Sequence, residues 1–107
     1  MGSMPDPMQI LTPSEIADAA LADWHQSGDT LTARFATGDF ATGLELVNRI
    51  GASAEKFDHH PDLTLTYPTV EITMSSHDVG GITIRDLRLA RTISEHAASL
   101  GVAPAHD

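Results

Sequence analysis

The clearest structural signal in this sequence is LTLTYPTVEITMS, residues 63–75. Apolar side chains alternate with polar ones on both sides of Pro68, which is the period of a strand that buries one face. Because proline interrupts the alternation, the stretch predicts two consecutive strands, at residues 63–67 and 70–75, with a common buried face.

Helical patterns lie on either side of this strand pair. Residues 83–86, Thr-Ile-Arg-Asp, form a capping box, and apolar residues then recur every three or four positions. They predict a helix over residues 83–100 that stops at Gly101. Upstream, Asp39 can cap a second helix that ends near residue 55 or 56.

The N-terminal third adds one helix and one strand. Residues 12–15, Thr-Pro-Ser-Glu, supply an N-cap, a proline at the first helical position and a glutamate at the third. A first helix is therefore expected to run to about Trp24 or His25. Residues 30–35 alternate as a strand. The order of elements favours an antiparallel sheet with helices on one face and a threonine-rich face opposite, either solvated or an interface.

We expect one domain, at residues 12–101. The start, Met1-Gly2-Ser3-Met4, is interpreted as a cloning remnant ahead of a native Met4, residues 1–11 as this remnant plus an irregular lead-in, and residues 102–107 as a C-terminal tail. A chain of 107 residues can bury one hydrophobic core but not a large internal cavity. A ligand site is therefore expected to be shallow or shared between subunits.

The composition excludes several classes of function. With 6 Lys plus Arg against 15 Asp plus Glu, the formal net charge is -9, and the basic residues are scattered singly, which argues against nucleic-acid binding. The absence of cysteine leaves His, Asp and Glu to carry any chemistry. No apolar run approaches the roughly 20 residues that span a bilayer, and no signal peptide is recognisable. We therefore expect a cytoplasmic protein that does not bind membranes.

Three of the six histidines fall near junctions between predicted strands and loops, where rigid scaffolds present functional groups. His59 and His60 precede Pro61, which biases His60 toward an extended backbone, so the two imidazoles should point in different directions. His77 lies where the last strand runs out. Taken alone, His59 is explained equally well as a loop residue whose side chain forms a hydrogen bond with the backbone. The remaining histidines are expected to be solvated: His25, His96 and His106.

Alternation also sorts the residues at the end of the last strand. Ser75 and His77 share one face, whereas Ser76 and Asp78 share the other. Asp86 has a structural explanation of its own, because the third residue of a capping box stabilises a helix start by about 1 kcal/mol without any catalytic part.

The joint spacing of these residues is more specific than any one of them. His59-His60-Pro61 is followed after five residues by Tyr67, after nine more by His77 and after eight more by Asp86. With the flanking runs EKFDHHPD (55–62), SSHD (75–78) and GIT (81–83), this pattern resembles the signature of the pterin-4a-carbinolamine dehydratase family. The resemblance extends upstream through Trp24, Phe35, Asp39-Phe40 and Arg49, and departs from the family at Thr37 and Leu46, where phenylalanine is common.

The resemblance implies an α+β fold with a four-stranded antiparallel sheet and three helices packed on one face. Only three strands are evident in the sequence, so the fourth is expected to be short or to include Phe57 and its neighbours. The implied activity is that of a hydro-lyase, which dehydrates a 4a-hydroxytetrahydropterin to quinonoid dihydropterin without cofactor or metal. Such an enzyme recycles the cofactor of pterin-dependent hydroxylases. The implied partners are the pterin, a functional link to an aromatic amino acid hydroxylase, and further copies of the chain in a homodimer or homotetramer.

The same resemblance implies general acid-base catalysis by histidine, since imidazole with an ordinary pKa of about 6.5 can donate or accept a proton at neutral pH. His59 and His77 would handle the protons, and His60 would bind the substrate or assist. Asp86 would orient a histidine or the helix start. The implied catalytic set is His59, His60, His77 and Asp86, and the substrate-binding set is Asp58, His59, His60, Pro61, Ser75, Ser76, His77 and Asp78.

Three other functions are open at this point. A protein of this fold could act as a non-catalytic or moonlighting dimerisation or binding module, because animal members of the family also bind a transcription factor. The three histidines with Asp86 could hold zinc or iron, but no helical His-x-x-x-His spacing supports a metal site. A serine hydrolase built on Ser75 and His77 lacks a nucleophile elbow.

Overall fold

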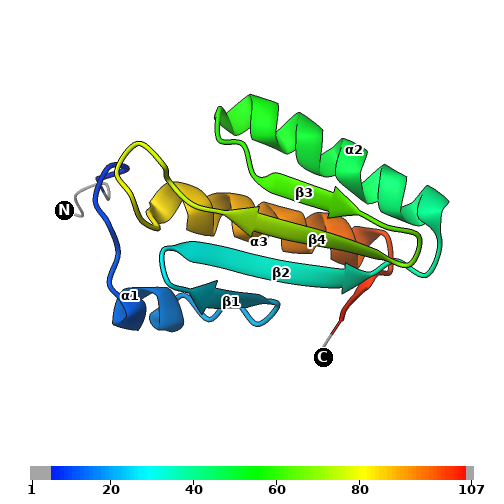
Figure 1. The fold of residues 1–107 in the computed structure, drawn as a ribbon, viewed down its shortest axis with the longest axis horizontal. Coiled ribbons are helices and arrows are strands. Elements are labelled where there is room, and N and C mark those ends of the chain that lie inside the picture. Colours follow the sequence, from blue (N-terminus) through cyan, green and yellow to red (C-terminus); the bar gives the residue numbers. More distant parts are fainter. Residues whose placement is uncertain (1–5, 106–107) are drawn as a thin grey trace.

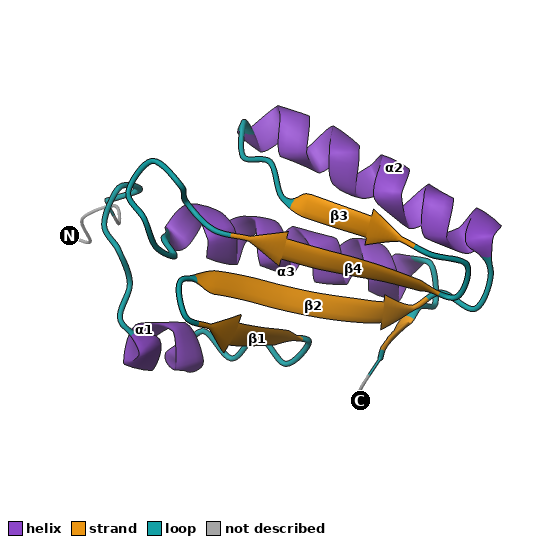
Figure 2. Ribbon diagram, viewed as in Figure 1, coloured by secondary structure: helices purple, strands orange, loops and turns teal. Residues whose placement is uncertain are grey.

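The computed structural model describes residues 6–105, so the expected cloning remnant and His106 lie outside the described residues. In chain order the elements are α1 (Pro13–Asp18), β1 (Trp24–Ser27), β2 (Thr30–Ala36), α2 (Phe40–Phe57), β3 (Asp62–Leu65), β4 (Thr69–Met74), α3 (Ile84–Ser99) and β5 (Ala103–Pro104). Four antiparallel strands form a sheet in the order β1-β2-β4-β3, and the two-residue β5 also pairs with β2 (Figures 1 and 2). The predicted α+β class, with helices packed against a four-stranded antiparallel sheet, is confirmed.

The alternating stretch at residues 63–75 forms one edge and one central strand of this sheet. Leu63 and Leu65 of β3 lie opposite Ile72 and Val70 of β4, so these side chains share one face. α2 and α3 lie side by side across that face and close the core (Figure 2). Burial of one face fixes the strand register, because a slip of one residue would turn every apolar side chain outward. The largest buried side chains are Phe35, Leu31, Leu46, Ile50, Ile72, Leu89, Ile93 and Val70.

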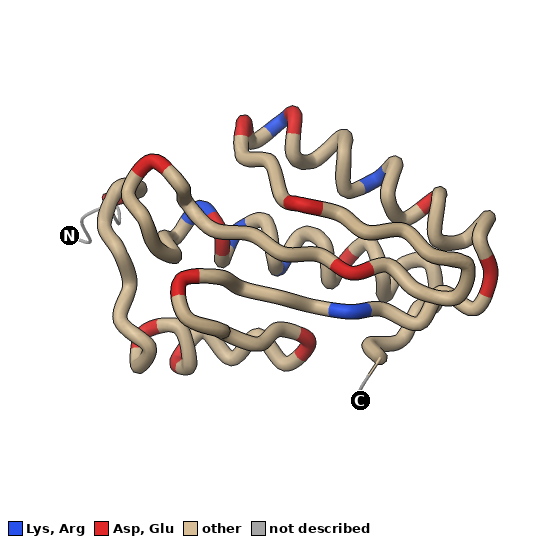
Figure 3. The backbone as a smooth tube through the Cα atoms, viewed as in Figure 1, with Lys and Arg blue, Asp and Glu red and all other residues tan. Residues whose placement is uncertain are grey.

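The opposite face of the sheet is polar, as the sequence predicts. Thr32 of β2 lies opposite Thr73 of β4, and Arg34 lies opposite Glu71. Thr64 of β3 also faces Glu71. Acidic positions outnumber basic ones along the chain (Figure 3), in line with the net charge of -9. This face is therefore suited to water or to another polar surface.

The first helix is shorter than predicted. α1 begins with the expected capping box of Thr12 and Glu15, but it ends at Asp18 and not at Trp24 or His25. The physical reason is local, because Ala20 takes a positive φ of 54°, which the helix cannot continue through. Within residues 6–105, no helix has the length and apolar character needed to cross a membrane.

The fourth strand lies in this shortened region and not near Phe57. Trp24 begins β1, its side chain is buried, and its Nε1–H donates to Oγ of Ser94 at 3.0 Å. β1 and β2 form a hairpin whose turn uses Gly28 at a φ of 60°. Phe57 is instead the last residue of α2. The apolar face attributed to a longer helix is thus divided between α1 and β1.

The chain adds to the sheet after Gly101, which leaves α3 at a φ of 71°. Val102 is 9% exposed and packs into the core. Ala103 and Pro104 of β5 then pair with Ala36 and Phe35, next to the part of β2 that β1 covers. Residues assigned to a tail by the sequence pattern therefore include a strand.

Candidate active site

His59 reaches the interior of the molecule through a change of backbone direction at the end of α2. The helix ends at Phe57, and Asp58 takes a left-handed conformation (φ 51°, ψ 46°), which aspartate tolerates better than most residues. The backbone N–H of His59 then donates to the carbonyl of Ala54 at 3.1 Å. His59 is consequently only 8% exposed, although it lies in a loop between α2 and β3.

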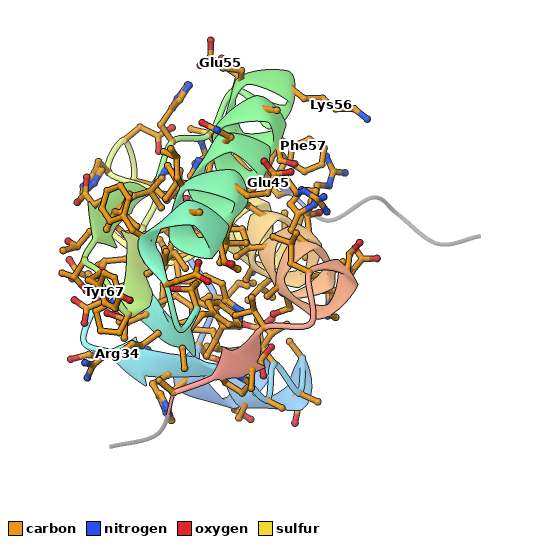
Figure 4. All side chains as sticks on the ribbon, turned by 90° about the vertical axis from the view of Figure 1, so that its right-hand side faces the viewer. Arg34, Glu45, Glu55, Lys56, Phe57 and Tyr67 are labelled. Atoms are coloured by element: carbon orange, nitrogen blue, oxygen red, sulfur yellow. The ribbon has the colours of Figure 1, made fainter. Side chains whose placement is uncertain are left out.

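His60 lies at the surface. Its Nε2 hydrogen-bonds with the carboxylate of Glu55 on the last turn of α2. Figure 4 shows Glu55 at the end of α2, extending away from the body of the molecule. Pro61 then leads the chain into β3. The two adjacent imidazoles therefore point in different directions, as the sequence predicts.

Asp86 is fully buried beside His59. It is the third residue of α3, and its Oδ2 accepts the backbone N–H of Thr83 at 2.9 Å, which completes the predicted capping box. Its Oδ1 lies 2.7 Å from Nε2 of His59. The sequence left undecided whether Asp86 orients the helix start or a histidine, and in the structure Asp86 contacts both.

Ser76 joins the end of β4 to the start of α3. Its backbone N–H donates to the carbonyl of Gly81 at 2.8 Å and closes a tight turn in which Gly80 takes a φ of 75°. The Ser76 hydroxyl donates to Oδ2 of Asp86 at 2.7 Å and lies 2.8 Å from Oγ1 of Thr83. Since Ser76 is only 1% exposed, its hydroxyl faces this buried network and not solvent.

The other residues predicted at this strand end differ in burial, since Ser75 is buried and Asp78 is exposed. Oγ of Ser75 is 3.3 Å from Nδ1 of His77, so these two side chains meet, as alternation predicts. His77 is exposed. Asp78 accepts a hydrogen bond from the Arg85 guanidinium at 2.9 Å, and this bond holds the pKa of the Asp78 carboxyl below its ordinary value.

The lead-in segment is bound over the start of α3. Nε–H of Arg85 donates to the carbonyl of Pro7 at 2.8 Å, and the backbone N–H of Leu11 donates to the carbonyl of Ile82 at 2.8 Å. A Cβ added to Gly81 would lie 2.8 Å from the Ile10 side chain, so the two segments are in close contact. The lead-in is therefore ordered by the same corner of the fold that holds Asp86.

The structure brings together some of the predicted residues and not others. His59, Asp86 and Ser76 form one hydrogen-bonded network, whereas in the described part of the chain no hydrogen bond links His60 or His77 to it. Thr83 is a member that the sequence identified only as a helix cap. The capping box is the signal that could have found it, because it places a hydroxyl and a carboxylate within one helical turn.

Two hollows in the described surface have other linings. One lies between α1 and β1 and includes Ile16, Leu21 and Trp24. The other lies on the polar sheet face beside Arg34 and Glu71. Neither hollow includes a predicted site residue, so a shallow or shared pocket stays a prediction. Among residues 6–105, no cluster of His, Asp and Glu is arranged to hold a metal ion.

The fold is shared with a protein of known structure, which defines the class of protein. The chain is similar to the crystal structure of a transcriptional coactivator/pterin dehydratase from Brucella melitensis, with a TM-score of 0.78 and 31% sequence identity. The match covers 83% of this chain and 99% of that one. The arrangement of three helices on an antiparallel sheet is therefore that of a pterin dehydratase of known structure.

The sequence comparisons then identify the family. The sequence model of the pterin 4 alpha carbinolamine dehydratase family matches residues 9–96. Proteins named pterin-4-alpha-carbinolamine dehydratase from Nocardia farcinica and Thermosynechococcus vestitus are 40% and 42% identical, over 83% and 81% of this chain and 96% and 94% of their own. The chain therefore belongs to the pterin 4 alpha carbinolamine dehydratase family, a family of hydro-lyases, and the resemblance drawn from the sequence is confirmed.

Proposed function

We propose that this protein dehydrates a 4a-hydroxytetrahydropterin to quinonoid dihydropterin by histidine general acid-base catalysis. The observation that carries the proposal is the buried pair of His59, in the loop between α2 and β3, and Asp86, in the first turn of α3, 2.7 Å apart. In the reaction the C4a–O bond breaks and the hydroxyl leaves as water. The N5–H bond also breaks, and its electron pair forms the C4a=N5 double bond. One proton is delivered and one is removed, so the chemistry needs only groups that transfer protons.

A buried carboxylate against one ring nitrogen makes His59 suited to this task. Asp86 fixes the orientation of the ring and stabilises the imidazolium that forms when His59 accepts a proton. His77, exposed in the turn after β4, is the second proton-transferring group in the proposal. His60 binds the substrate or assists, in contact with Glu55. The remaining pocket residues in the proposal are Asp58, Pro61, Ser75 and Asp78. Ser76, predicted with them from the sequence, is buried, and its hydroxyl is bonded to Asp86.

Replacement of His59 or His77 tests this function directly. Each change to alanine is expected to lower kcat by about 10²- to 10⁴-fold, the usual contribution of a positioned acid or base. Turnover is measured on 4a-hydroxytetrahydropterin generated in the assay, against a buffer blank, because the substrate also dehydrates unassisted. His25→Ala, on the exposed part of β1, is the matched control and should retain wild-type turnover. Wild-type rates in both site variants would reject the assignment.

We further propose that the chain works in the cytoplasm as a homodimer or homotetramer. In this role it recycles the pterin cofactor of an aromatic amino acid hydroxylase. What supports the assembly is the polar sheet face, which α2 and α3 leave open. The link to a hydroxylase follows from the chemistry, because a 4a-hydroxypterin is the adduct left after a pterin has delivered oxygen. Coupled assays with and without this protein would show whether it speeds pterin turnover by such a hydroxylase.

A further inference from the structure

We propose that Ser76 is a positioning residue that, through Asp86, keeps the ring proton of His59 on Nε2. Nδ1 of His59 is then the nitrogen that exchanges a proton with the substrate. This inference rests on the proposed function, because it specifies how the His59 side chain acts within it. It is carried by the direction of the hydrogen bonds in the buried network of Thr83, Ser76, Asp86 and His59.

The direction of the network is set at Thr83. Its Oγ1 accepts the backbone N–H of Arg85 at 3.2 Å and, at 3.3 Å, the longer branch of the Arg85 Nε–H bond that is shared with the Pro7 carbonyl. The Thr83 hydroxyl proton is therefore available for Oγ of Ser76, 2.8 Å away. Each hydroxyl donates only one hydrogen bond, so Ser76 can accept from Thr83 while donating its own proton to Oδ2 of Asp86 at 2.7 Å.

Two hydrogen-bond donors converge on one oxygen of the Asp86 carboxyl group. Oδ2 receives the Ser76 hydroxyl at 2.7 Å and the Thr83 backbone N–H at 2.9 Å, both in a fully buried position. Hydrogen bonds to a carboxylate stabilise its charge, and a buried charge requires such partners. An ionised carboxylate can only accept, so the proton between Oδ1 and the His59 ring belongs to Nε2.

The consequence concerns the other ring nitrogen. A neutral imidazole protonated at Nε2 carries its lone pair on Nδ1. Among residues 6–105, no hydrogen bond occupies Nδ1 of His59. Nδ1 is thus the nitrogen left to accept a proton from the substrate or, once protonated, to return it. Ser76 does not touch the substrate in this scheme, since its side chain is 1% exposed and its hydroxyl is used inside the network.

The experiment reads the tautomer by NMR of protein with isotope-labelled histidines, at about pH 8.5, where imidazole is ordinarily neutral. In the wild type, the His59 ring is expected to show a proton-bearing Nε2 and a lone-pair Nδ1. In Ser76→Ala, Asp86 loses one donor and competes for the shared proton. When the carboxyl takes that proton, Nδ1 of His59 takes up one proton from solvent, so part of the His59 signal should move to the Nδ1–H form. A wild-type ring protonated at Nδ1 would overturn the proposal before any variant is made.

Kinetics supply the second readout. Ser76→Ala is expected to lower kcat by about 10- to 100-fold, the range found when residues that orient metal-ligating histidines are replaced, with KM nearly unchanged. Ser53→Ala is the matched control, because it deletes another buried serine hydroxyl in a side-chain hydrogen bond, 2.7 Å from Nε2 of His96, between α2 and α3. It should leave both the His59 tautomer and kcat as in the wild type.

The outcomes separate this inference from the proposed function. If Ser76→Ala leaves the tautomer and kcat unchanged, Ser76 has no positioning role, whatever the enzyme does. If the wild type has no dehydratase activity, both the proposed function and the proton exchange between Nδ1 and the substrate are rejected. The tautomer measurement needs no substrate, so it still decides the role of Ser76. If Ser76→Ala does not fold, the wild-type spectrum alone decides the position of the proton.

Discussion

The buried side chain of Thr37 is an exception to the rule that buried polar groups form hydrogen bonds. Its Oγ1 is buried and is the one side-chain oxygen or nitrogen of this kind, within the described residues, that has no hydrogen-bond partner. Replacement by the isosteric valine removes this group without changing the volume. We expect Thr37→Val to raise the free energy of unfolding by about 1 kcal/mol, measured by urea denaturation. A lower stability than the wild type would contradict the unpaired state.

Asp78 gives a prediction for the dependence of stability on pH. Because Arg85 lowers the pKa of its carboxyl in the folded state, the stabilisation is present above the ordinary aspartate pKa of about 4 and is lost as the pH falls through the lower, folded value. Asp78→Asn should therefore be less stable than the wild type at neutral pH and equal to it in strong acid. Urea unfolding at both pH values checks this, and a difference that persists in acid would point to another cause.

At the scale of single residues, the sequence named His59, Ser76 and Asp86 but did not predict the hydrogen bonds that connect them. The contact between Asp86 and His59 was one of two alternatives, because a capping box explains an aspartate equally well. Ser76 was expected on a strand face with Asp78. Its hydroxyl turns into the buried network because β4 ends at Met74 and the turn closed by Ser76 and Gly81 redirects the chain. Such a turn is set by tertiary contacts that a spacing pattern does not contain.

At the scale of elements, α2 offers a test of packing against β3. A Cβ added at Gly43 would lie 2.7 Å from Cδ1 of Leu65 and 3.3 Å from Oγ1 of Thr37, whereas one added at Gly51 meets nothing within 4 Å. Alanine in a helix interior is favoured over glycine by about 1 kcal/mol. We expect Gly51→Ala to raise the free energy of unfolding by about that amount, and Gly43→Ala to gain clearly less or to lose stability. Equal gains in thermal or urea denaturation would show that α2 and β3 are loosely packed.

The elements that the sequence predicted are those whose pattern is long. α2, α3, β2 and the pair β3 and β4 carry several apolar repeats each, and both capping boxes appear as expected. β1 was missed because it has only four residues and follows an alanine-rich stretch that imitates a helix face until Ala20 breaks it. β5 was missed because two residues have no period.

At the scale of the whole molecule, assembly should depend on salt. A net charge of -9 makes identical chains repel one another, and salt screens this repulsion within about 10 Å at 0.1 M. The polar sheet face presents both signs, with Arg34 opposite Glu71. We expect light scattering to show a dimer or tetramer that is populated more fully as salt is raised. A strict monomer at all salt concentrations would contradict the proposed oligomer.

The lead-in segment, which is bound over the start of α3, offers a position for a fluorescent label. Met8 is about half exposed, next to the Pro7 carbonyl that Arg85 holds, and the chain contains no cysteine. Met8→Cys would therefore provide a single attachment point for an environment-sensitive dye. The dye would lie beside the corner that joins the lead-in to the start of α3, at the other end of the molecule from β5 (Figure 1). Because Arg85 bonds both the Pro7 carbonyl and Asp78, a change in emission on addition of the pterin would show that the lead-in responds to an occupied site.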